Sequence, residues 1–218
     1  MYVLAAVALC GLTMPTAEGA IIPAEFDAFA GNATAGTGSL GGNDFTWTIT
    51  GVGYRALGAI STFDNTESFL SPIFAPELLL VDWLAIEAPA GSASGTLTIA
   101  FDAAVTDLVF YNDRIDRSDF DFSPTTNDVT RLSGNADHAL DGARVYDTDP
   151  STVGLADSAR GSVRVNGSFS QFDINLSKID PGGDIYQLQF AQTPEPGSVL
   201  LLGAGLGVLV IVRRKRKA

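Results

Sequence analysis

The sequence predicts an all-β fold, an antiparallel β-sandwich of jelly-roll type, on two observations. First, apolar and polar residues alternate with a period of two, as in residues 45–50 (FTWTIT) and 96–101 (TLTIAF), which is typical of strands with one buried and one wet face. Second, turn-forming residues recur at spacings that suit short strands joined by loops. The alternation continues in residues 105–111, 162–165, 172–176 and 186–190, and the turns lie at residues 89–91, 133–134, 141–142 and 181–183.

Residues 163–176 (VRVNGSFSQFDINL) predict a β-hairpin. Asn166-Gly167 is a preferred dipeptide of the type I′ turn and stands between two alternating segments. If Val165 pairs with Ser168, the apolar residues of both strands share one face, and a slip of one residue would destroy that match. These apolar residues are Val163, Val165, Phe172, Ile174 and Leu176.

Two segments are less clear. Residues 76–89 (PELLLVDWLAIEAP) have the length and leading proline of a helix, but their acidic residues recur every five positions and form no polar helical face. We therefore expect a buried strand or two there. Residues 31–43 hold five glycines and no charge before Asp44, and we expect a flexible loop or a glycine-rich edge.

The charge distribution excludes nucleic acid as a partner. Residues 21–193 carry eight Lys and Arg against twenty-three Asp and Glu, a net charge of −15. Binding to phosphates requires Lys and Arg to displace counterions, so such a surface repels nucleic acid and anionic membranes alike.

Residues 1–19 are typical of a secretory signal peptide with cleavage after Gly19. An apolar run at residues 2–12 is followed by Pro15 and small residues. No basic residue precedes the run, so either the start lies upstream or the signal is atypical; a lipoprotein signal ending at Cys10 is the alternative. Removal of this segment takes away the only Cys and both Met residues, which excludes disulfides and thiolate sites from the mature chain.

The C-terminus (TPEPGSVLLLGAGLGVLVIVRRKRKA, residues 193–218) predicts a short membrane span. Its fourteen apolar or glycine residues, 199–212, would form a helix of about 21 Å, against a hydrocarbon core of about 30 Å. Ser198 lengthens the span to residues 198–212, and long basic side chains can reach the interface. The basic cluster should remain on the cytoplasmic side; it comprises Arg213, Arg214, Lys215, Arg216 and Lys217.

This tail resembles the PEP-CTERM sorting signal of exopolysaccharide-producing Gram-negative bacteria. The resemblance rests on Pro194-Glu195-Pro196, followed by Gly197, the short span and the terminal basic cluster. It implies recognition by an exosortase, cleavage near Pro-Glu-Pro, and passage through an inner-membrane intermediate to the cell surface or extracellular matrix. A permanent single-span anchor is the alternative. The predicted organisation is a signal peptide (1–19), one ectodomain (20–192) and a sorting signal (193–218).

An acidic cluster makes calcium a candidate ligand. Four carboxylates lie within nine residues, and calcium takes several oxygen ligands in irregular geometry. An EF-hand does not fit, because Pro124 and Thr130 stand where that loop needs Gly and Glu. The alternative is a solvated acidic loop. The four residues are Asp113, Asp116, Asp119 and Asp121.

We expect a non-enzymatic protein without a cofactor. His138 is the only histidine, no Gly-x-Ser-x-Gly motif surrounds a serine, and a loop position explains His138 best. The expected role is structural or adhesive, within the exopolysaccharide of a biofilm. The alternatives are a carbohydrate-binding module, in which Trp47, Trp83 or Tyr111 stacks on sugar rings, and, third, a secreted hydrolase.

Overall fold

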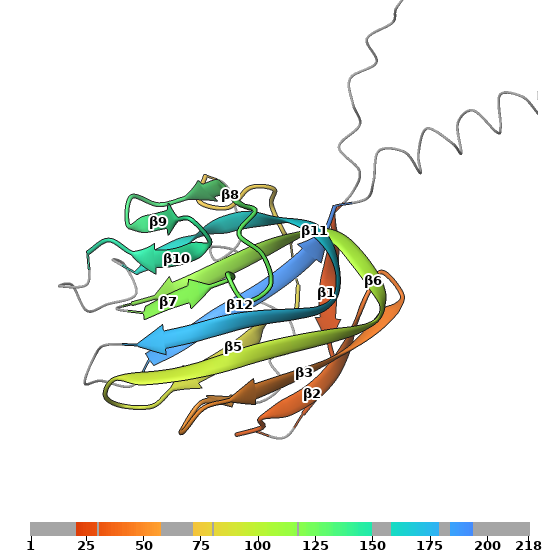
Figure 1. The fold of residues 1–218 in the computed structure, drawn as a ribbon, viewed down its shortest axis with the longest axis horizontal. Coiled ribbons are helices and arrows are strands. Elements are labelled where there is room, and N and C mark those ends of the chain that lie inside the picture. Colours follow the sequence, from red (N-terminus) through yellow and green to blue (C-terminus); the bar gives the residue numbers. More distant parts are fainter. Residues whose placement is uncertain are drawn as a thin grey trace, which may run out of the picture. The chain divides into compact units, whose positions relative to one another are not determined.

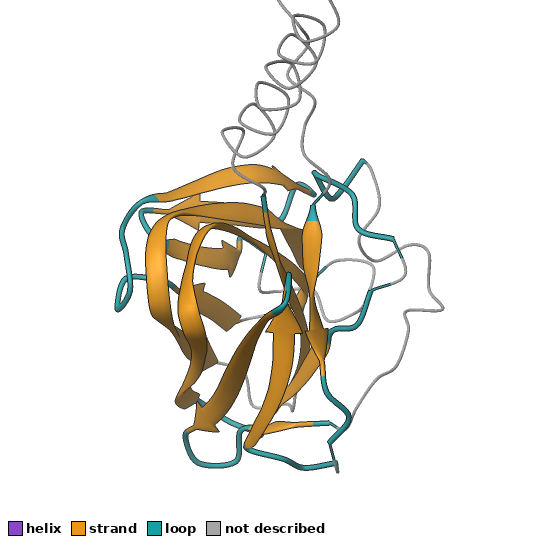
Figure 2. Cartoon of the chain, turned by 90° about the vertical axis from the view of Figure 1, so that its right-hand side faces the viewer, coloured by secondary structure: helices purple, strands orange, loops and turns teal. Residues whose placement is uncertain are grey.

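Every regular element in the described part of the computed structural model is a β-strand, which confirms the all-β prediction (Figure 2). The structure describes residues 21–29, 31–57, 72–79, 81–116, 118–149, 158–178 and 184–193. They belong to one unit, Ile21–Thr193. The predicted signal helix and membrane span fall outside the described residues. Within the described residues, no helix has the length and apolar character needed to cross a membrane.

The described residues form twelve strands: β1 (Ile22–Phe26), β2 (Ala35–Leu40), β3 (Asn43–Thr50), β4 (Arg55–Ala56), β5 (Leu84–Ala88), β6 (Ala93–Ile115), β7 (Ser118–Asp121), β8 (Val129–Gly134), β9 (His138–Asp141), β10 (Arg144–Asp147), β11 (Ala159–Lys178) and β12 (Asp184–Gln192).

Five strands close into a β-barrel core instead of stacking as two separate sheets. The ring runs β12–β1–β2–β3–β6 and returns to β12, and all its pairs are antiparallel. Closure depends on the length of β6, which pairs with β3 through residues 96–101 and with β12 through residues 108–113. Figure 1 shows the bend of β6 between these halves. A closed ring satisfies the edge hydrogen bonds of its strands.

The remaining strands extend from the ring. β11 pairs with β6 along nearly its whole length, then with β8 through its first half and β7 through its second. β10 and β9 continue from β7, while β4 and β5 extend from β12 (Figure 1).

The predicted hairpin at Asn166-Gly167 is wrong. These residues lie inside the single strand β11, at a bulge where Val165 pairs with Leu108 and Ser168 with Thr106. The strand pairs with the bent β6 on both sides of the bulge, so the two halves do not pair with each other. Gly167 supplies the φ of 137° that the bulge needs. The apolar residues of the predicted face are nevertheless buried. Side chains alternate between the two faces of a strand whether the segment forms a hairpin or one bulged strand.

Residues 31–43 were also predicted incorrectly, since they contain β2, which pairs with both β1 and β3. The glycines make room for large rings from β3. A Cβ added at Gly36 would lie 2.5 Å from Cζ2 of Trp47, and one added at Gly38 would overlap the ring of Phe45. Glycine here allows close packing within the sheet.

Within residues 76–89, Leu84–Ala88 form the strand β5, and none of the described residues is helical. β5 is almost wholly buried, which explains why its sequence shows no alternation. The residues before it cover a second apolar cluster on the outer face of β6 and β12. That cluster contains Phe74, Leu78, Val81, Val109, Tyr111 and Ala191.

Phe190 lies at the centre of the main core. Its side chain is 0% exposed, and its ring centroid lies 5.2–6.0 Å from four other rings. Those aromatic rings belong to β1, β3 and β6, so Phe190 packs against barrel strands that are far apart in sequence. They belong to Phe26, Phe45, Phe101 and Phe110.

Candidate functional site

A polar groove crosses the wet face of the sheet. Pairing places Thr50 beside Thr96, Thr96 beside Asn175, Asn175 beside Asp121, and Asp121 beside Arg144, so one row of polar residues spans five strands. A cavity of about 620 Å³ opens along this row. It is lined by Thr50, Gly51, Ser94, Gly95, Thr96, Asp119, Asp121, Arg144, Asn175, Leu176 and Ser177.

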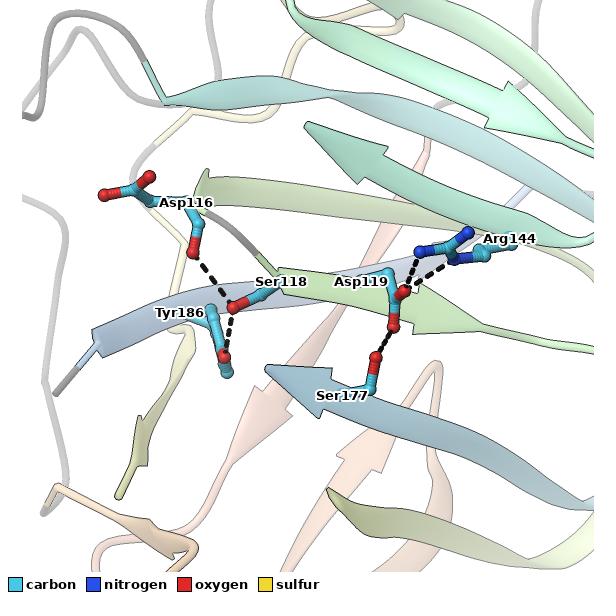
Figure 3. Close-up of polar contacts among 6 residues, drawn as sticks. All are labelled: Asp116, Ser118, Asp119, Arg144, Ser177 and Tyr186. Atoms are coloured by element: carbon cyan, nitrogen blue, oxygen red, sulfur yellow. Dashed lines mark hydrogen bonds and ion pairs between the residues drawn. The ribbon is translucent and has the colours of Figure 1, made fainter. Parts of the chain in front are cut away.

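Strand alternation orients the acidic side chains of β7. Ser118 and Phe120 point inward, and the hydroxyl of Ser118 lies 2.6 Å from that of Tyr186 (Figure 3). Asp119 and Asp121 therefore lie on the opposite face, toward the groove.

Three donor atoms surround the carboxylate of Asp119. Nε of Arg144 donates to its carboxylate at 2.5 Å, a second guanidinium nitrogen of Arg144 pairs with it, and Ser177 donates a third bond (Figure 3). The Asp119 side chain is 11% exposed, whereas that of Arg144 is 53% exposed. The guanidinium also lies over the ring of Tyr146, 5.2 Å from its centroid. This arrangement holds Arg144 in place at the groove wall.

The rest of the groove offers both donors and acceptors. The carboxylate of Asp121 accepts bonds from the backbone N–H and the hydroxyl of Ser123, each at 2.9 Å. Oδ1 of Asn175 accepts from the hydroxyl of Thr96 at 3.2 Å. Because Asn175 and Thr50 are exposed, this surface can bind a polar ligand through several directional hydrogen bonds.

The structure does not bring the four carboxylates predicted to bind calcium to one point. Asp119 and Asp121 face the groove, while Asp113 is buried at the end of β6, 3.4 Å from Nε of Arg160. Asp116 follows β6, and its carbonyl accepts a bond from Ser118. Among the described residues, no three His, Cys, Asp or Glu side chains are placed to hold a metal ion.

The prediction that His138 lies in a loop is wrong. His138 is the first residue of β9, and its side chain is buried. Nε of Arg131 donates to its Nδ1 at 3.2 Å, so the proton lies on Nε2, which is 3.3 Å from Oδ1 of Asn112. Burial, and then the charge of Arg131, lower the pKa of His138 to about 4. The imidazole is neutral at pH 7 and has the environment of a structural residue.

The aromatic residues proposed as sugar platforms occupy other positions. Trp47 and Tyr111 are 0% exposed and belong to the two cores. Trp83 is half-buried against the outer cluster. Sugar stacking on Trp47 or Tyr111 is therefore excluded in this fold.

The sequence analysis missed Arg144, Asn175 and Ser177 as site residues. The alternating threonines of β3 and β6 did predict a wet face, but the row depends on register between strands that are distant in sequence. Arg144 and Asn175 come together only because β7 lies between β10 and β11.

The comparisons with known proteins identify the end of the chain. The PEP-CTERM protein-sorting motif matches residues 192–217, which confirms the resemblance. The match contains the Pro194–Gly197 motif and the basic residues 213–217, all of which lie outside the described residues. This motif indicates an exported protein that an exosortase processes and directs to the cell surface. No curated protein and no solved structure matches the chain.

The folded unit leads directly into this motif. The match begins at Gln192, the last residue of β12, which pairs with Ile22 of β1 and Leu108 of β6. The hydroxyl of Thr193 then donates to the carbonyl of Asp107 at 3.2 Å. The ends of the folded unit, at Ile22 and Gln192, are therefore neighbours.

Proposed function

We propose that this chain is a non-enzymatic surface protein whose folded domain has a structural or adhesive role in the exopolysaccharide of a biofilm. The N-terminal signal exports it, the span at residues 198–212 holds an inner-membrane intermediate, and exosortase cleavage near Pro-Glu-Pro releases the domain. The observation that carries the proposal is the sorting motif that begins at the last residue of β12.

The composition of the domain supports this setting. Residues 21–193 contain no thiol and have a net charge of −15, so the domain needs no reducing compartment and remains soluble by self-repulsion. Its wet face is rich in hydroxyl and amide groups, which suit a hydrated polysaccharide matrix.

A carbohydrate-binding module is the second candidate function, and the polar groove favours it. Asn175, Asp121 and Thr96 offer the donors and acceptors that sugar hydroxyls need. A Ser-His-Asp hydrolase gains no support, because the only histidine of the sequence is buried between Arg131 and Asn112.

Replacing Pro194, Glu195 and Pro196 together by alanine is expected to abolish surface display. The extended conformation that the two prolines impose is lost, and the processing enzyme no longer receives its recognition sequence. Immunoblots of membrane, surface and matrix fractions should then show the uncleaved chain in the inner membrane. Pro124→Ala, at an exposed proline of the domain, is the matched control and should reach the matrix normally. Normal matrix location of the triple variant would contradict the proposal.

A further inference from the structure

We infer that the polar groove binds a neutral, hydroxyl-rich saccharide chain. This inference rests on the proposed function, because it names the ligand class through which the domain would associate with exopolysaccharide. Every sugar hydroxyl both donates and accepts hydrogen bonds, and the groove offers both kinds of partner from rigid strands. Its volume of about 620 Å³ lies within the range of roughly 300–1,000 Å³ that is usual for ligand sites.

The charges of the groove favour a neutral ligand over an acidic one. Arg144 is the only cation among the described residues that line the groove, and two of its guanidinium nitrogens already pair with Asp119. Asp121 adds a second carboxylate, and no other basic side chain is found in the described part of the groove lining. Residues 21–193 as a whole have a net charge of −15. These negative charges would repel the carboxylates of a uronic acid chain, whereas a neutral sugar experiences no such repulsion.

The polar row is long enough for a chain instead of one sugar. Its five strands span four gaps of about 4.8 Å, or roughly 19 Å. A second row continues beside it, where Thr48 pairs with Thr98 and Thr98 with Asp173. The hydroxyl of Thr98 donates to the carboxylate of Asp173 at 2.6 Å. Several consecutive sugar units can therefore contact the same face.

The groove lies far along β6 from the end of the domain that leads into the sorting motif. Thr193 contacts Asp107 at the bend, whereas Thr96 is near the start of the strand. The eleven residue steps from Thr96 to Asp107 correspond to up to roughly 36 Å of strand at about 3.3 Å per residue. Figure 1 shows the start of β6 and its bend at opposite sides of the domain. The groove is thus remote from Thr193, the last residue of the folded unit.

The test measures glycan binding by the full chain in detergent micelles. A glycan array compares neutral glucan and galactan hexasaccharides with oligouronates, and calorimetry then gives Kd for the best neutral probe. The groove variant is Thr96→Ala with Asn175→Ala. The matched control is Asn127→Ala with Thr130→Ala, which removes the same exposed groups outside the groove.

We expect wild type and control to bind a neutral probe with equal Kd, and the groove variant to bind at least tenfold more weakly while melting within a few degrees of wild type. Asn175→Asp, which keeps the side-chain shape but removes its N–H donors, should also weaken binding. The inference is overturned if no neutral probe binds, if oligouronates bind better, or if either groove variant binds normally. If binding fails but the chain is found at the cell surface, the sorting proposal stands. If the chain binds a neutral glycan but is not found at the cell surface, the sorting proposal alone is refuted.

Discussion

Phe190→Ala is expected to destabilise the domain by about 4 kcal/mol, within the range of roughly 3–5 kcal/mol for removing a buried phenylalanine. The side chain is 0% exposed and contacts the rings of Phe26, Phe45, Phe101 and Phe110. Its removal leaves a cavity between strands that pair around the whole ring, so those strands cannot close over it without breaking register. Urea unfolding of the full chain in micelles, followed by tryptophan fluorescence, measures the change.

Ile185→Ala is the control on the same strand. Ile185 is 39% exposed, so its truncation should cost less than about 1 kcal/mol. Equal losses for the two variants would show that Phe190 does not hold the centre of the core.

Acidification is expected to remove about 3 kcal/mol of stability through His138 alone. Burial lowers the pKa of His138 from 6.5 in the unfolded chain to about 4 in the fold, and this difference corresponds to about 3 kcal/mol. Between these values the unfolded chain takes up the proton and the folded chain does not. The contribution is therefore fully present above pH 6.5, falls as the pH drops toward 4, and changes no further below that.

The measurement compares urea unfolding of wild type and His138→Gln from pH 7.5 to pH 4. His138 is the only histidine, so the difference in slope reports one imidazole. Its ring contacts Arg131 and Asn112, with Asp137 beside it in sequence and Asp147 opposite in β10. Burial raises the pKa of Asp147 above its ordinary value, so protonation of that carboxyl stabilises the fold as the pH falls. This effect is opposite in sense to that of His138 and is present in both proteins. Parallel curves for the two proteins would refute the assignment.

Local patterns in the sequence predicted the strands better than their partners. Alternation in residues 45–50 and 96–101 identified β3 and β6 and their buried faces, because one face of each strand packs in the core. Asn166-Gly167 predicted a hairpin turn wrongly, because a glycine with positive φ occurs in β-bulges as well as in turns. Pairing with the bent strand β6 on both sides makes this position a bulge. The glycines of β2 suggested a loop or an edge, because the sequence does not show that the rings of Trp47 and Phe45 fill the space beside them.

The site was less predictable than the fold. Asp119 and Asp121 were predicted only as two of four candidate calcium ligands, and the sequence gives no local sign that Arg144 pairs with Asp119. Such a contact depends on which strands are neighbours, a property of the whole topology. The sorting motif is different, because it is a pattern along the chain that depends on no strand pairing, and sequence alone is enough to find it.

The central claim is that this chain leaves the cytosol and loses both hydrophobic ends. The intact mass of the protein from the surface and matrix fractions of its native host tests it most directly, because one spectrum locates both termini. We predict a chain that begins at Ala20 and ends within or beside residues 194–197. A full-length chain of 218 residues, found in the cytoplasm, would contradict the account.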